Sequence, residues 1–254
     1  MHYVLTMIRL IDIYKSFGNN VVLNGLNLTI EKGKVTVIIG LSGGGKSVLL
    51  KHIIGLIRPD AGAIKIDGQD ITGFNDRQLN RIRKKFGMLF QEAALFDSMT
   101  VGQNIAFPLV EHTTMKNSEI LKIVREKLSQ VGLSGIENKM PSELSGGMKK
   151  RVGLARAIAL EPEIILFDEP TTGLDPIMSD IIGTLIVDIQ SKLNVTCIVI
   201  SHDIHGTLRI AQKIAMLHNG VIIESGTPEE IKKSSNPILK QFIEGKAEGP
   251  MRVL

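Results

Sequence analysis

The sequence has few of the features that stabilise small secreted proteins. Cys197 is its only cysteine, so no disulfide can form within the chain. This residue lies in the apolar run 195–200, where we expect a buried and unreactive thiol. The lack of disulfides is typical of a protein from a reducing compartment.

Long hydrophobic runs are also missing. A membrane-spanning helix needs about 20 apolar residues, whereas the longest runs here, such as 37–41 and 164–167, have the length of strands. The N-terminus has no basic residue ahead of its short apolar stretch, which argues against a secretory signal. Met7 is a second candidate start beside Met1. The net charge of +4 is compatible with binding to a nucleotide or to a membrane surface, and it does not distinguish between them.

The 254 residues suffice for one large α/β domain. Between residues 4 and 39, short apolar runs alternate with turn signals, and we expect strands joined by tight turns at 18–20, 24–25 and 32–33. The β-branched run 35–39 is typical of a strand buried on both faces.

Helical periodicity follows this β-rich start. It predicts helices over 46–57, 117–132 and roughly 147–160, and further buried strands are expected over 164–167 and 196–200. Such alternation predicts a mostly parallel sheet with helices on both faces.

Residues 40–47 match the phosphate-binding pattern G-x-x-x-x-G-K-[ST]. The loop lies between a predicted buried strand and a predicted helix, which disfavours a chance match in a glycine-rich chain. Backbone N–H groups and the helix N-terminus would bind phosphate oxygens, Lys46 would bridge the β- and γ-phosphates, and Ser47 would coordinate Mg²⁺. The candidate ATP-binding residues of this loop are Gly40, Ser42, Gly43, Gly44, Gly45, Lys46 and Ser47, with Val48 next to them.

Two acids end the buried strand 164–167. A parallel arrangement with the strand before the phosphate loop would bring Asp168 to the Mg²⁺. Glu169 would then polarise a water for in-line attack on the γ-phosphate. The alternative is a solvated strand end, because acids are common at such positions.

A second anion-binding turn, Leu144-Ser145-Gly146-Gly147, precedes a helix with a basic start. A plain helix capped by Ser145 is the alternative. Phosphate loop, LSGG turn and the Asp168–Glu169 strand, in this order, resemble the ATP-binding cassette (ABC) family over nearly the whole chain. The resemblance implies an α/β fold of the P-loop NTPase type, with a mostly parallel sheet flanked by helices, an N-terminal antiparallel β part and a helical subdomain at about 92–152.

The resemblance also implies function for further residues. Two copies would face each other head to tail, so that Ser145 and Gly147 contact the nucleotide of the partner copy. The other positions that match family motifs are Phe17 (adenine stacking, or else a core residue), Gln91 (Mg²⁺ and the membrane subunit), Asp175 (the opposite subunit) and His202 (the γ-phosphate). Catalysis would then rest on Glu169, His202 and Lys46, and the Mg²⁺ ligands would be Ser47, Gln91 and Asp168. The remaining histidines, His2, His52, His112, His205 and His218, fit no motif and are expected to be structural or exposed.

Val48 departs from the family, in which many members have a hydroxyl at this position. Together with the segments 90–98, 100–109 and 144–151, it resembles the ATPases of MCE-type lipid transporters, which include the system that maintains outer-membrane lipid asymmetry. The resemblance implies a separate multispanning permease, an MCE-domain substrate-binding protein, no nucleic acid, and a peripheral position at the cytoplasmic face of the inner membrane. Phe96, Phe107 and Pro108 would line the permease groove, or else belong to the helical core.

The tail also resembles this subfamily. We expect an ABC ATPase domain over 1–240 and a C-terminal tail over 241–254 that contacts the second subunit, although by itself the tail is typical of a frayed terminus. Other transport substrates remain open, because partner subunits select the cargo. A soluble ABC ATPase is a weaker alternative, because the chain has one phosphate loop and no heptad tract. A P-loop kinase would have no use for the LSGG turn.

Overall fold

The structure, a computed structural model, describes residues 5–251, which divide into two compact units. The first unit comprises residues 5–79 and 198–251, and the second comprises residues 80–197. The chain enters the second unit within α2 (Asp76–Arg83) and returns within β8 (Thr196–Ser201). His2 and Met1, named above as a structural histidine and a candidate start, lie outside the described residues.

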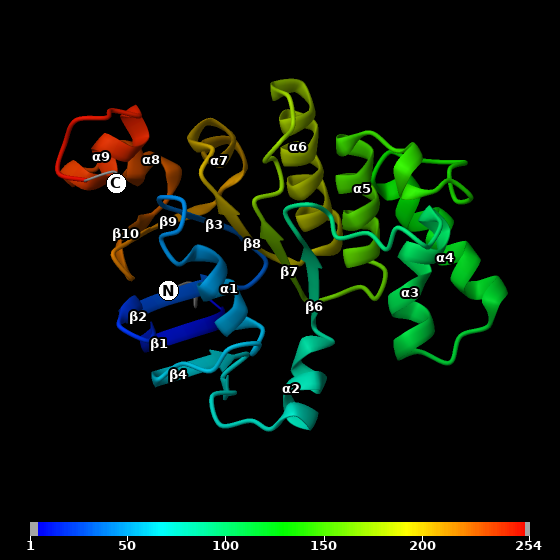
Figure 1. Cartoon of the computed structure of the whole chain (residues 1–254), viewed down its shortest axis with the longest axis horizontal. Helices are drawn as coiled ribbons and strands as arrows, with labels where there is room; N and C mark the ends of the chain where they lie inside the picture. The colour runs from blue at the N-terminus through cyan, green and yellow to red at the C-terminus, as the bar shows by residue number, and fades with distance from the viewer. Residues whose placement is uncertain (1–4, 252–254) are drawn as a thin grey trace. The chain divides into compact units, whose positions relative to one another are not determined.

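The first unit contains the expected antiparallel β part. Its strands are β1 (Thr6–Phe17), β2 (Asn20–Glu31), β4 (Ala61–Ile66) and β5 (Gln69–Asp70), in the order β2-β1-β4-β5 (Figure 1). Apolar side chains on the paired strands β1 and β2, such as Ile8, Leu10 and Leu28, are buried. Their burial explains why this β-rich segment forms a sheet.

One predicted turn is wrong. Asn24-Gly25 lies inside β2 rather than between two strands. The pairing with β1 shifts there, since Ile13 pairs with Leu26 and Tyr14 with Asn24, and Gly25 has a φ of 74°. A side chain at Gly25 would meet the Tyr14 ring, because a Cβ there would lie 2.8 Å from the hydroxyl oxygen. The glycine therefore forms a β-bulge. In sequence, an Asn-Gly pair at a bulge has the same residues as a turn signal.

Parallel pairing positions the phosphate loop. β3 (Val35–Ile39) is buried along its whole length and pairs in parallel with β9 (Lys213–His218), which pairs antiparallel with β10 (Val221–Gly226). The strand order in the first unit is β10-β9-β3-β8. Its helices are α1 (Lys46–Ile53), α7 (Ile204–Ile210), α8 (Pro228–Lys232) and α9 (Pro237–Glu244).

α1 is shorter than the expected helix over 46–57. It ends at Ile53, and Gly55 adopts the left-handed conformation with a φ of 68°. A glycine in this conformation commonly terminates a helix. Leu56, which falls within the range of the expected helix, is accordingly outside α1 and 57% exposed.

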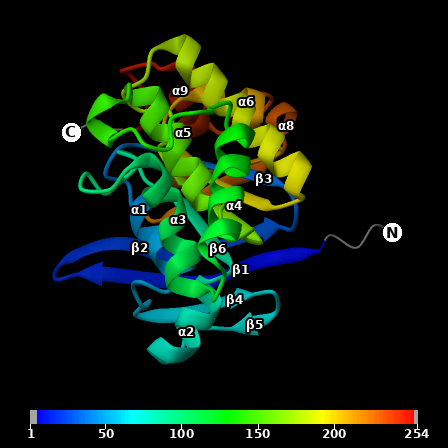
Figure 2. The ribbon, with the colours of Figure 1, turned by 90° about the vertical axis from the view of Figure 1, so that its right-hand side faces the viewer.

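The second unit combines a parallel strand pair with helices. β6 (Phe86–Leu89) pairs in parallel with β7 (Ile164–Asp168). α3 (Val101–His112), α4 (Asn117–Gln130) and α5 (Gly146–Ala157) pack against one another, as Figures 1 and 2 both show. α6 (Pro176–Leu193) follows β7, and the short 3₁₀ helix Pro141–Glu143 precedes α5. The helices expected over 117–132 and 147–160 are thus present with shorter C-terminal ends, and the α/β fold class is confirmed.

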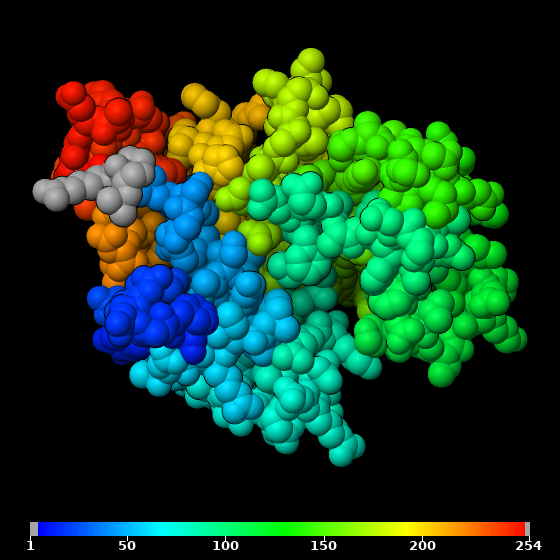
Figure 3. Space-filling view, viewed as in Figure 1, coloured from blue at the N-terminus to red at the C-terminus, as the bar shows by residue number. Residues whose placement is uncertain are grey.

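Residues 246–251 fold onto α9 of their own chain, and in Figure 3 they belong to one red cluster. The Gln241 amide donates from Nε2 to the Lys246 and Met251 carbonyl oxygens, at 3.2 and 3.1 Å, and its Oε1 accepts from the Met251 N–H at 2.7 Å. Gln241 and Met251 are both buried. The tail is therefore ordered by specific bonds as far as Met251. None of the helices in the described part of the chain is long and apolar enough to span a membrane.

Candidate functional site

The phosphate loop connects β3 to α1 and depends on glycine backbone geometry. A Cβ at Gly40 would lie 2.3 Å from the Leu217 carbonyl oxygen, so any side chain there would displace β9. Gly45 has a φ of 92°, a conformation that residues with a side chain rarely adopt. The sequence-predicted loop residues are thus brought together in one tight turn.

Lys46 and the start of α1 make this loop electropositive. The Lys46 side chain is 4% exposed, and Nζ donates to the carbonyl oxygens of Gly40, at 2.9 Å, and Leu41, at 2.8 Å. Gly45 is the N-cap of α1 and supplies no side-chain cap, and the first turn contains no acidic residue. A buried ammonium beside an uncapped helix N-terminus fits a polyphosphate chain.

Two other predicted residues lie in the first unit. Phe17 ends β1, its ring is 48% exposed, and the Lys15 ammonium lies 5.5 Å from the ring centroid. The alternative of a core phenylalanine is therefore wrong, and the ring has surface available for stacking. His202 is exposed between β8 and α7, where Asp203 caps the helix by accepting from the Gly206 N–H at 3.0 Å.

Gln91, Asp168 and Glu169 lie at one edge of the second unit. In the parallel pairing of β6 and β7, Leu89 lies opposite Phe167. Glu169 directly follows β7 and Gln91 lies just beyond the end of β6, so both residues are at the carboxyl ends of neighbouring strands. Ligands commonly bind at such an edge of an open α/β sheet.

The Glu169 carboxylate is held in place locally. Thr172 donates its hydroxyl to Glu169 Oε2 at 3.0 Å, and Glu169 itself has a left-handed backbone, with a φ of 48°. Strained backbone of this kind is often found at functional sites. Sequence reasoning missed Thr172 as a positioning residue. A threonine three residues after the acid, at the start of a turn, was the available signal.

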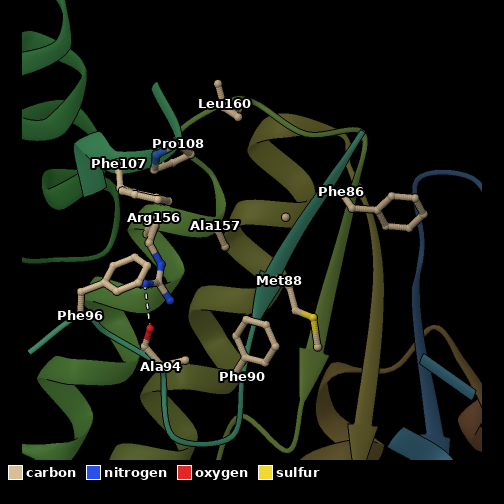
Figure 4. Close-up of a pocket in the computed structure, with 11 residues that line it drawn as sticks. Phe86, Met88, Phe90, Ala94, Phe96, Phe107, Pro108, Arg156, Ala157 and Leu160 are labelled. Atoms are coloured by element: carbon tan, nitrogen blue, oxygen red, sulfur yellow. Dashed lines mark hydrogen bonds between the residues drawn. The ribbon is translucent and has the colours of Figure 1, made fainter. Parts of the chain in front are cut away.

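The segment after Gln91 is fixed by Arg156, which sequence reasoning also missed. Ala93 and Ala94 both have left-handed backbones, with φ of 61° and 47°. Arg156 in α5 donates to both of their carbonyl oxygens at 2.8 Å, as Figure 4 shows for Ala94. Burial lowers the pKa of the Arg156 guanidinium from its ordinary value. Nothing local in the sequence indicates a contact between residues more than sixty positions apart.

The LSGG turn and the loop before α6 lie together in the second unit. Ser145 caps α5, with Oγ accepting from the Met148 N–H at 3.3 Å, and Asp175 caps α6, accepting from the N–H groups of Ile177 and Met178 at 3.0 Å. Gly147 is buried against α6, because a Cβ there would lie 2.2 Å from the Met178 methyl carbon. Ser145 and Asp175 remain exposed and available to a partner.

The three residues predicted to bind Mg²⁺ are divided between the units, with Ser47 in the first and with Gln91 and Asp168 in the second. Residues 5–251 contain no group of three or more His, Cys, Asp or Glu side chains arranged to hold a metal. In the second unit, the Asp168 carboxylate and the Gln91 amide are oxygen ligands of the kind that Mg²⁺ prefers.

Comparison with known proteins agrees with this geometry. A family model described as "ABC transporter" matches residues 23–172. The protein named "Intermembrane phospholipid transport system ATP-binding protein MlaF" from Haemophilus influenzae is 46% identical over 92% of this chain and 89% of its own length. MlaF from Escherichia coli K12 is 42% identical over 98% of this chain and 92% of its own length.

Other relatives have different names. The "Probable ribonucleotide transport ATP-binding protein mkl" of Mycobacterium tuberculosis is 46% identical over 93% of this chain, which spans only 66% of that longer protein. Among solved structures, cbiO1 from Clostridium perfringens, part of the transporter complex cbiONQ, has a TM-score of 0.84 and 30% identity, with 93% of this chain and 94% of that chain covered. The dimeric cassette MJ0796, bound to ADP and Pi after hydrolysis, has a TM-score of 0.80 and 32% identity, with 87% of this chain and 99% of that chain covered. The chain therefore belongs to the ABC transporter family and is an ATP-binding cassette ATPase.

Proposed function

We propose that this chain hydrolyses ATP to power the transport of phospholipid, as the ATPase subunit of a transporter with a separate permease. The observation that supports ATP hydrolysis best is the electropositive phosphate loop of the first unit, and the second unit contributes an oriented carboxylate. Lys46 and the backbone around it bind the phosphates. Thr172 orients Glu169, which accepts a proton from the attacking water.

Mg²⁺ would neutralise charge on the β- and γ-phosphates, held by Ser47, Gln91 and Asp168. The exposed ring of Phe17 stacks on the adenine, and His202 stabilises the charge that develops on the γ-phosphate.

Substitution of Glu169 by Gln keeps the hydrogen bond from Thr172 but removes the base. We expect Glu169→Gln to bind ATP normally and to accumulate a closed, ATP-loaded dimer, measured by size-exclusion chromatography with labelled ATP. Rapid turnover by this variant would refute the assignment.

In the proposed dimer, a second copy of the chain contacts the nucleotide that the first copy binds. Ser145 and Asp175 are exposed at adjacent helix starts, and the related cassette MJ0796 is dimeric. We assign Ser145, Gly147 and Asp175 to contacts with the other copy. Exposed apolar side chains beside Asp175, Ile177 at 75% and Ile181 at 38%, give this face surface to bury.

A groove in the second unit is the proposed docking site for the permease. It has a volume of about 410 Å³ and is mostly apolar, as Figure 4 shows. The Phe96 and Phe107 rings lie 4.8 Å apart, centroid to centroid, with the Arg156 guanidinium 5.7 Å from the Phe96 centroid. The three residues expected at this groove, Phe96, Phe107 and Pro108, all line it, together with Phe86, Phe90 and Leu160.

Phospholipid is the proposed cargo because of the MlaF relatives, which match this chain over nearly their whole length. The mycobacterial relatives are named for ribonucleotide transport, and ribonucleotide is therefore the second candidate. We place the subunit at the cytoplasmic face of the inner membrane, bound to a permease, with an MCE-domain protein as a further partner.

The test is capture of a tagged copy from detergent-solubilised native membranes, with mass spectrometry of the bound proteins and lipids. A multispanning permease, an MCE-domain protein and phospholipid are the expected result. A permease with a soluble solute-binding protein would overturn the lipid assignment and keep the ATPase. A copy with Phe96→Asp and Phe107→Asp should lose the permease, and Leu121→Asp, at an exposed position on α4, is the matched control.

A further inference from the structure

Lys150 is a buried lysine that neither the phosphate loop nor the metal ligands account for. It lies in α5, three residues after Gly147, and is 5% exposed. A lysine is rarely buried to this extent unless its ammonium has a partner. Lys150 Nζ donates a hydrogen bond to the main-chain carbonyl oxygen of Gln91. The helix that begins at the LSGG turn is therefore tied to the residue that follows β6.

The surroundings of Lys150 are acidic. Burial lowers the pKa of the Lys150 ammonium, and the negative charges of Glu92 and Glu169 oppose this shift. The buried ammonium thus has negative charge in its surroundings as well as the Gln91 carbonyl oxygen as its hydrogen-bond acceptor.

Contacts around Lys150 keep α5 close to this edge. A Cβ at Gly153, one turn further along α5, would lie 2.8 Å from a Leu89 methyl carbon and 3.2 Å from the Ala93 Cβ. Arg156, a further turn along, holds the Ala93 and Ala94 carbonyl oxygens. One face of α5 thus follows the segment from Leu89 to Ala94, and Lys150 contributes a buried ammonium to this face.

We propose that Lys150 is a positioning residue for ATP hydrolysis, whose ammonium fixes the main chain at Gln91. Since Ser145 caps the start of α5, the same lysine links the turn that contacts the partner copy to Gln91 of its own chain. The inference rests on the proposed roles of Glu169 and Gln91.

The experiment compares Lys150→Met, Lys150→Arg and Lys149→Met in the full chain, purified with its membrane partners. For Lys150→Met we expect a fall in kcat of about tenfold or more with the affinity for Mg·ATP changed by less than about threefold, because an interaction specific to the reaction is lost. Lys150→Arg should recover at least about half of the wild-type kcat, because it restores charge and donor. Lys149→Met, the neighbouring lysine on the same helix, is the matched control and should keep its kcat within about twofold.

Three results would overturn the proposal. They are an unchanged kcat in Lys150→Met, a joint loss of kcat and ATP affinity, and a failure of Lys150→Arg to restore turnover. Should Lys150→Met not fold, Lys150→Gln is measured in the same way. Loss of turnover with intact ATP affinity then supports the role, and unchanged turnover overturns it. Glu169→Gln is assayed in parallel to separate the two proposals. Full turnover by Glu169→Gln would refute the role of Glu169 as the base. An inactive Glu169→Gln together with a fully active Lys150→Met would refute only the positioning role of Lys150.

Discussion

The side chain at position 48 can change the affinity for ATP without changing the backbone of the phosphate loop. Val48 lies in the first turn of α1, directly after Ser47, and its carbonyl oxygen accepts from His52 Nδ1 at 2.7 Å. A valine cannot donate a hydrogen bond to phosphate, whereas a threonine of nearly the same shape can. We expect Val48→Thr to bind ATP about fivefold more tightly, since one hydrogen bond contributes about 1 kcal/mol.

The measurement for Val48→Thr is the equilibrium dissociation constant of a fluorescent ATP analogue in Mg²⁺. Val187→Thr, the same change at an exposed position of α6, serves as a control and should leave this constant unchanged. Equal ATP affinity of wild type and Val48→Thr would show that position 48 does not reach the phosphates.

Cys197 illustrates a residue whose chemistry is suppressed by its position. Its thiol is completely buried in β8, and burial raises the thiol pKa to about 12. Since the pKa in the folded state lies above the ordinary value of about 8.5, the neutral thiol predominates below pH 12 and reacts slowly. Folded-state stability from this group is complete below about pH 8.5 and is lost as the pH rises towards 12.

We therefore expect negligible labelling of Cys197 by iodoacetamide between pH 7 and pH 9 in the folded protein, measured by mass spectrometry. The same protein in guanidinium should label fully within minutes. Rapid labelling without denaturant would contradict the buried position of β8.

At the scale of elements, the contact between α5 and the segment after β6 combines the proposed metal ligand with the proposed permease groove. Arg156 stabilises the left-handed conformations of Ala93 and Ala94 and lies over the Phe96 ring. We expect Arg156→Met to leave ATP affinity unchanged and to reduce permease binding and coupled turnover about tenfold, because two charge-assisted bonds of about 1.5–3 kcal/mol each are lost.

The change is checked by permease capture and by ATP turnover of the membrane complex. Arg125→Met, at an exposed position of α4, removes a positive charge without removing such bonds and is the matched control. Normal capture and normal turnover by Arg156→Met would show that the segment 93–96 is held by other contacts.

At the scale of the whole molecule, the tail is the feature that concerns assembly. Residues 246–251 fold onto α9 through Gln241. We expect a chain truncated after Glu244 to keep its ATP affinity, because the phosphate loop is untouched, and to assemble less well with its second copy. The truncation is combined with Glu169→Gln, and the dimer fraction is measured by size-exclusion chromatography with ATP. An unchanged dimer fraction would contradict this prediction.

A point variant separates the fold of the tail from its length. Gln241→Ala removes the three hydrogen bonds to Lys246 and Met251 but keeps every tail residue. We expect it to reproduce part of the assembly defect if the folded tail is what the partner contacts. Gln130→Ala, at the end of α4, is the matched control.

Features that depend on contiguous residues could be predicted from the amino-acid sequence. The phosphate loop needs glycines, a lysine and a hydroxyl at fixed spacing between a strand and a helix, and this order is legible in residues 35–53. The caps Ser145 and Asp175 and the buried strands β3 and β7 are local in the same sense. The family resemblance extended these local patterns to Phe17, Gln91 and His202.

Features that join residues far apart in the chain could not be predicted and became apparent only in the folded protein. The bulge at Gly25 depends on the Tyr14 ring of the neighbouring strand. Arg156 reaches the Ala93 and Ala94 carbonyl oxygens across more than sixty residues, and Lys150 reaches Gln91 across 59. Basic side chains on a predicted helix are expected to be solvated. Folding buries Lys150 near the start of α5 and half-buries Arg156 in its last turn, because α5 packs against β6. A cation removed from water must then find a carbonyl or carboxylate oxygen.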